Sequence, residues 1–74
     1  MATYNGWNSW NAWNVNLWIT NEEYTYNKAC ELVRQYGVER AAAKYLCWVG
    51  FTARTPDGAK YTKRSLVECF RSLL

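Results

Sequence analysis

Apolar side chains recur with helical spacing near the start of the chain. The positions i, i+3, i+4 and i+7 are filled by Trp10, Trp13, Asn14 and Leu17. This spacing predicts a helix over residues 9–20, with a side-chain oxygen of Asn8 or Ser9 capping its first turn. A second apolar side is formed by Val15, Trp18 and Ile19. Because this helix is apolar on more than one face, we expect it to lie at the centre of the core.

A second helix is predicted directly after the first. Asn21 precedes Glu22 and Glu23, which indicates a helix with Asn21 as its N-cap and two carboxylates near its positive end. The positions expected to face the core are Tyr26, Ala29, Cys30, Val33 and either Tyr36 or Gly37. Gly37 is typical of the left-handed residue that ends a helix, so we expect the second helix to end near Tyr36.

A third helix is predicted from Val38 to about Val49, where Gly50 ends it. Its expected inward positions are Val38, Ala41, Ala42, Tyr45, Leu46 and Val49. The alanines of this segment leave space for a large tryptophan on the opposite helix.

The only proline of the chain lies in the turn sequence Thr55-Pro56-Asp57-Gly58. Proline favours the second position of such a turn, and glycine tolerates a positive φ at the fourth. The residues that flank the turn alternate, so a short β-hairpin is an open alternative to a plain loop. The alternating positions are Phe51, Ala53, Ala59 and Tyr61.

The last segment predicts a helix capped by Thr62. Its apolar stripe is Leu66, Val67, Phe70, Leu73 and Leu74, and its polar side is Lys63, Arg64, Glu68 and Arg71. The chain as a whole therefore predicts an all-α fold, a small bundle of three to four short helices, with the hairpin around residues 55–58 left open.

Composition favours one folded domain over residues 1–74. Half of the chain is hydrophobic and 20% is charged, which excludes a disordered chain. A domain this small buries only about 60–65% of the surface that it exposes when unfolded, so each large side chain matters. We therefore expect Trp13, Trp18 and Trp48 in the core. Asn14 lies among apolar residues and is expected to tie the first helix to a loop backbone.

Few residues of the sequence could carry enzyme chemistry. There is no histidine, and the one pair of adjacent carboxylates, Glu22 and Glu23, points to different sides of a helix. Cys30, Cys47 and Cys69 form no CxxC pair and are expected to be reduced core residues. The sequence predicts a protein that is not an enzyme, with no catalytic residues, no cofactor and no metal site.

Basic side chains gather in the second half of the chain. Residues 1–33 hold one lysine and three glutamates, whereas residues 34–74 hold eight basic and three acidic residues. A cluster of basic side chains surrounds the turn and the start of the last helix. Cations at the start of a helix are disfavoured by the helix dipole, so the cluster needs another explanation. This cluster is Arg54, Lys60, Lys63 and Arg64. It is either a solvated surface or a contact with phosphates or with acidic groups of a partner.

Two further binding candidates lie at the start of the chain. Trp7 and Trp10 come at or before the first helical turn. They either pack against the helix or stay exposed as anchors of an interface, a role that suits tryptophan.

The first helix carries a dense motif, Trp13-Asn14-Val15 followed by Leu17-Trp18-Ile19. It resembles a family of small bacteriophage and mobile-element proteins whose start typically reads Trp-Thr-Asn-Tyr-Glu-Thr-Trp-Asn-Val-x-Leu-Trp-Ile-x-Asn. Members also tend to have a Thr-Pro-Asp-Gly-like turn before a short helix, as residues 55–58 do here. The resemblance implies a phage-borne accessory protein and carries no established activity.

Proteins of that size and origin often bind and block a host protein, including defence machinery such as CRISPR effectors, so we expect an inhibitor of a host protein. The alternative is a small nucleic-acid-binding protein that uses the basic residues at 54–64. We expect no membrane contact, a place in the host bacterial cytoplasm, and a tendency to form a homodimer through surplus apolar surface.

Overall fold

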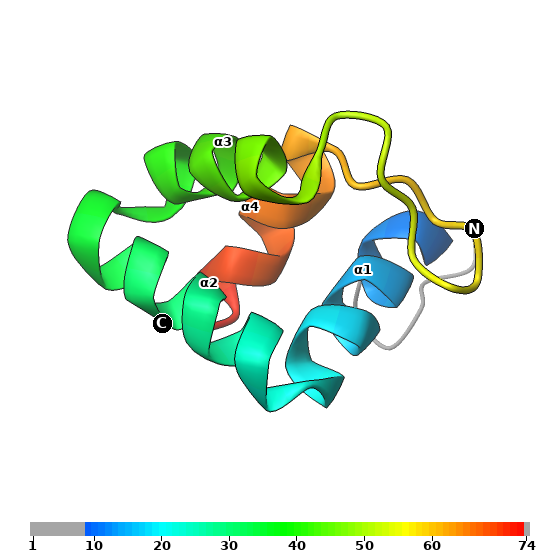
Figure 1. Ribbon diagram of the computed structural model, residues 1–74, viewed down its shortest axis with the longest axis horizontal. Coiled ribbons are helices and arrows are strands. Elements are labelled where there is room, and N and C mark those ends of the chain that lie inside the picture. The colour runs from blue at the N-terminus through cyan, green and yellow to red at the C-terminus, as the bar shows by residue number, and fades with distance from the viewer. Residues whose placement is uncertain (1–8, 74) are drawn as a thin grey trace.

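The computed structural model describes residues 9–73 and contains four helices in that range (Figure 1). The helices are α1 (Trp10–Asn21), α2 (Glu23–Tyr36), α3 (Val38–Val49) and α4 (Lys63–Arg71). The predicted all-α bundle is confirmed, and the bounds of α3 and α4 follow the sequence pattern closely.

Side-chain caps and glycines set most of the helix ends. The Ser9 hydroxyl accepts a hydrogen bond from the amide of Ala12 at 3.1 Å, and the Thr62 hydroxyl does the same for Ser65. Gly37, with φ 81°, ends α2, and its amide donates to a carbonyl of the last turn at 2.9 Å. Gly50, with φ 107°, ends α3 in the same way. These positive φ values favour glycine, as the sequence indicated.

The boundary between α1 and α2 differs from the prediction. Asn21 is the last residue of α1, and Glu22 is the N-cap of α2 without a side-chain capping bond. The Thr25 hydroxyl donates instead to the carbonyls of Ile19 at 2.8 Å and Glu22 at 3.1 Å. The first helix continues through Asn21 because Thr25 satisfies one of the carbonyls left free at its end.

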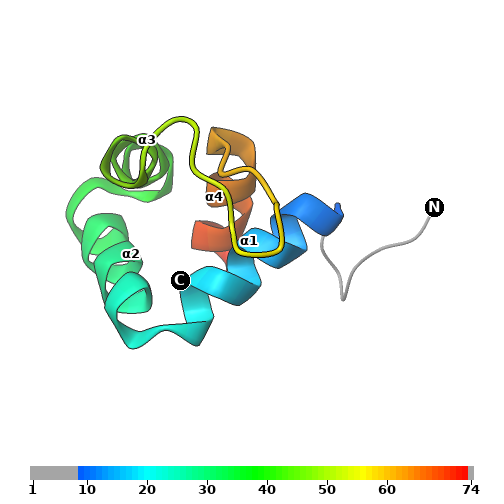
Figure 2. The same ribbon diagram turned by 45° about the vertical axis from the view of Figure 1, so that its right-hand side comes forward.

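Helix α4 lies at the centre of the bundle, which corrects the expectation that the first helix would. It packs extensively on both α1 and α3 and also contacts α2, whereas α1 contacts α2 and α4 but not α3 (Figures 1 and 2). Its apolar stripe explains this place, because Leu66, Cys69 and Phe70 are fully buried. One side of α1 is occupied by the loop before α4, which leaves α1 at the edge.

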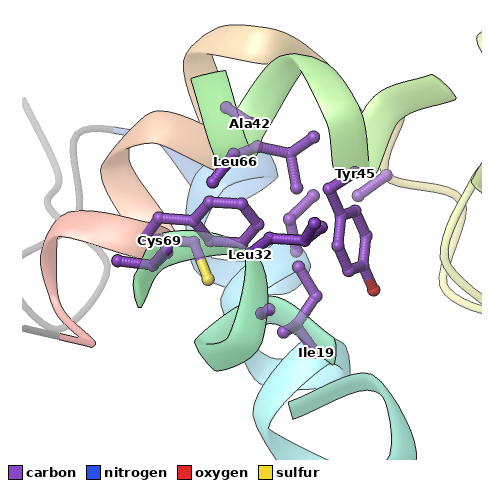
Figure 3. Close-up of a cluster of buried hydrophobic side chains, with 12 residues drawn as sticks. Ile19, Leu32, Ala42, Tyr45, Leu66 and Cys69 are labelled. Atoms are coloured by element: carbon purple, nitrogen blue, oxygen red, sulfur yellow. The ribbon is translucent and has the colours of Figure 1, made fainter. Parts of the chain in front are cut away.

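The core is built from aliphatic side chains, alanines, one tyrosine, one phenylalanine and one cysteine (Figure 3). Its members are Val15, Ile19, Ala29, Leu32, Val33, Ala41, Ala42, Tyr45, Ala59, Leu66, Cys69 and Phe70. The rings of Tyr45 and Phe70 meet edge to face, with centroids 5.5 Å apart. Burial raises the pKa of Tyr45 far above its ordinary value.

The predicted tryptophan core is wrong. Trp13 and Trp18 are only half-buried, and Trp48 keeps 41% of its surface exposed. Where a tryptophan was expected opposite the alanines of α3, Ala42 lies beside Leu66 of α4 (Figure 3). Buried alanines allow helices to pack closely, and the large rings that the core holds are those of Tyr45 and Phe70.

The cysteines are all free thiols, but only Cys69 is a buried core residue. Burial raises its pKa to about 12. Cys30 is half-buried and Cys47 is exposed, so the expectation of three core cysteines holds for one.

The loop between α3 and α4 folds back on itself around the predicted turn. The Gly58 amide donates to the Thr55 carbonyl at 2.8 Å, and φ of Gly58 is 97°. Arg54 and Lys60 form a single antiparallel bridge, with no strand around it in residues 9–73. The hairpin alternative is therefore reduced to one bridge beside a turn.

Candidate functional site

The turn at residues 55–58 is held by polar side chains of α1. Asn14 keeps only 1% of its surface exposed. Its Nδ2 donates to Oδ2 of Asp57 at 2.9 Å, and its Oδ1 accepts from the Thr55 hydroxyl at 2.6 Å. Trp18 Nε1 donates to the same Asp57 oxygen at 2.9 Å. These two donors hold the pKa of the Asp57 carboxyl below its usual range.

A second asparagine one turn earlier holds the backbone of the same loop. Asn11 Nδ2 donates to the Lys60 carbonyl and to the Ser65 hydroxyl, both at 2.8 Å, and Asn11 Oδ1 accepts from the Lys60 amide at 3.0 Å. The prediction placed a loop-backbone contact on Asn14. Asn14 does bind the loop, but through side chains, and Asn11 makes the backbone contact. The motif of α1 is thus a structural clamp on the turn.

The sequence-predicted binding residues that the structure describes belong to α1, to the loop before α4 and to α4. Trp7 is outside the described residues. Trp10 is the first residue of α1 and is 39% exposed. The Arg54 guanidinium donates to the Gly58 carbonyl at 2.9 Å, so one of its N–H groups is used to hold the turn. The side chain of Lys60 is exposed beside it.

Lys63 and Arg64 begin α4 and are exposed. The Lys63 ammonium lies 4.0 Å from one carboxylate oxygen of Glu39 on α3, and Arg71 lies 3.8 Å from the other. The carboxylate of Glu39 therefore lies among basic side chains at this position. The structure pairs Arg54 with Lys60 beside the turn, whereas Lys63 and Arg64 line a separate hollow together with Glu39 and Glu68.

A different surface concentrates aromatic rings and cations. We define the α2–α3 face as Tyr24, Lys28, Tyr36, Arg40, Lys44 and Trp48. The ring centroids of Tyr24 and Trp48 are 5.7 Å apart, which joins the start of α2 to the end of α3. Tyr24 is 70% exposed.

Each cation of the α2–α3 face lies over an aromatic ring. The Lys28 ammonium is 5.5 Å from the centroid of the Trp48 ring. At the other end, the Lys44 ammonium and the Arg40 guanidinium carbon lie 4.4 Å and 5.7 Å from the Tyr36 ring centroid. All three distances lie within the roughly 6 Å over which a cation is attracted to the face of a ring.

An open hollow lies on the same face, between α2 and α3. Its lining combines an apolar floor with two lysines and is formed by Lys28, Leu32, Ala43, Lys44, Cys47 and Trp48. Among residues 9–73, no group of three or more potential metal ligands was found, and no helix is long and apolar enough to cross a membrane. The arrangement suits the binding of a macromolecular surface.

A protein-family model matches residues 1–68, which is most of the chain. The chain therefore belongs to DUF7249, a family of unknown function. No curated protein and no solved structure gives a significant match.

For this DUF7249 member, the sequence reasoning missed the α2–α3 face. A signal was present, because Arg40, Lys44 and Trp48 are spaced four residues apart and share one side of α3. Tyr24 and Lys28 have the same spacing on α2. These two rows of residues form one surface only because α2 packs on α3. The spacing of residues along a single helix does not reveal that packing.

Proposed function

We propose that this protein is a stoichiometric binding protein whose α2–α3 face docks on a protein partner. The observation that carries the proposal is the cluster of three cation–π pairs on the rings of Trp48 and Tyr36, with the exposed ring of Tyr24 beside Trp48. Tryptophan, tyrosine and arginine dominate the energetics of protein interfaces, and pre-ordered side chains lose little entropy on binding.

A protein partner is favoured over single-stranded nucleic acid by the geometry of the rings. Bases stack on a free aromatic face. Here Lys28 already lies over Trp48, whose ring also packs against Tyr24 and Tyr45. The Tyr36 ring has Lys44 and Arg40 over it. Base stacking would have to displace these cations, whereas a protein surface can contact rings and cations together.

The proposed partner is a bacterial host protein that the binding inhibits. This part of the proposal is supported by the resemblance of the α1 motif and the turn to small phage proteins. Defence complexes such as CRISPR effectors are the first class to examine, and the proposed place of action is the host bacterial cytoplasm.

The test is a tagged pulldown from a bacterial host lysate, with and without nuclease, read by mass spectrometry. One host protein recovered at near-equal stoichiometry in both samples is the expected result. The activity of the purified partner should then fall in proportion to the amount of this protein that is added to it. Recovery only without nuclease would contradict the proposal and favour nucleic acid at residues 54–64.

A further inference from the structure

The hollow between α2 and α3 combines two kinds of surface. Its floor includes the buried Leu32, together with Ala43, Cys47 and the ring of Trp48. Lys28 and Lys44 line it from the two helices. An occupant of this hollow therefore meets apolar atoms together with two ammonium groups.

We propose that the hollow accepts an acidic protein segment that inserts a large apolar side chain between two carboxylates. This inference rests on the proposed protein-binding function and names the chemistry of its partner. The apolar floor is matched by the inserted side chain, and the lysines are matched by the carboxylates.

The two lysines that line the hollow explain why the segment must be acidic. Docking over the hollow removes water from Lys28 and Lys44, and a buried cation without a counter-charge is strongly unfavourable. Within the described residues, the carboxylate that pairs with either lysine is that of Glu31, 3.9 Å from Lys28 and largely exposed. Lys44 lies over a ring. The partner must therefore supply acidic groups.

The same charges argue against a second copy of the chain on this face. A two-fold dimer places the same patch on both sides of its interface. Lys28, Arg40 and Lys44 of one copy would then face those of the other, and this repulsion disfavours self-association through the α2–α3 face. The homodimer expected from the sequence would need another surface.

The experiment couples the nuclease-treated pulldown to a carbodiimide, which joins a lysine amine to a carboxylate in direct contact. The bait is the full chain, and linked peptides are identified by mass spectrometry. We expect links from Lys28 and Lys44 to aspartate or glutamate of the captured protein. The internal Lys28–Glu31 pair should also link and reports that the reagent has worked.

A charge-reversed bait supplies the quantitative comparison. Lys28→Glu with Lys44→Glu should reduce recovery of the partner about tenfold or more, since rim charges are then repelled. The matched control, Lys60→Glu with Lys63→Glu, makes the same change of net charge at the basic turn and should keep recovery within about twofold. Circular dichroism of both baits checks that they fold.

The outcomes separate this inference from the proposed function. A partner that is captured but linked only through Lys60 or Lys63 would overturn the acidic-segment inference and leave protein binding intact. Links between isotopically distinct copies of the chain would overturn it in favour of a dimer. Nuclease-sensitive recovery, or no captured protein, would contradict the proposed function itself.

Discussion

Replacing Asn14 with alanine should lower the free energy of unfolding by about 2 kcal/mol. The amide is buried, and it supplies the acceptor for the Thr55 hydroxyl, which is 4% exposed. Leaving a buried hydroxyl without that partner costs about 1–3 kcal/mol. The bond from Asn14 to Asp57 lies closer to solvent and adds less.

This loss is large for a domain of 74 residues, whose total stability is expected to be roughly 4–11 kcal/mol. Urea unfolding followed by far-ultraviolet circular dichroism measures it directly. Asn27→Ala on the exposed side of α2 is the matched control and should change stability by less than about 0.5 kcal/mol.

A double-mutant cycle with Thr55→Val tests whether the two side chains act together. Once Asn14 is replaced, removal of the Thr55 hydroxyl should cost about 1 kcal/mol less than in the wild type. Purely additive losses, or an Asn14→Ala protein as stable as the Asn27→Ala control, would refute the reasoning that the α1 motif clamps the turn.

The other predictions concern the core, the clamp carboxylate and the thiols. In the same urea assay, Phe70→Ala should lower the free energy of unfolding by about 3–5 kcal/mol, and Trp48→Ala should lower it clearly less. The reverse order would support the original prediction of a core built from tryptophan. Hydrogen bonding lowers the pKa of Asp57 in the folded state, so its stabilising effect is present above the unfolded pKa of 3.8 and is lost as pH falls through the lowered value. Asp57→Asn should therefore flatten the acid limb of the stability profile, and an unchanged profile would contradict this. Iodoacetamide should modify Cys47 quickly in the native protein and Cys69 only on unfolding, as peptide mass spectrometry can show.

Local signals predicted the helices well. The caps Ser9 and Thr62 and the positive-φ residues Gly37 and Gly50 act through contacts within about four residues, which a sequence displays directly. The helix boundary at Asn21 failed because a more distant donor, Thr25, decides it.

The core and the binding face were harder to predict because they depend on how helices pack. Tryptophan was assigned to the interior by its size, yet the fully buried positions of α2 and α3 include the small residues Ala29, Ala41 and Ala42, which favour close helix packing. The displaced Trp48 then joins Tyr24 across two helices. Such a contact between distant residues forms the candidate site and is visible only in the fold.

The most direct test of the central claim compares two baits in the nuclease-treated pulldown. Tyr24→Ser with Lys44→Ser removes one ring and one cation from the α2–α3 face, and Trp10→Ser with Lys60→Ser removes one aromatic ring and one lysine from α1 and the loop. The account predicts that only the first bait loses the host protein, while both keep the wild-type helical spectrum. Retention by the first bait and loss by the second would contradict it and assign binding to the turn.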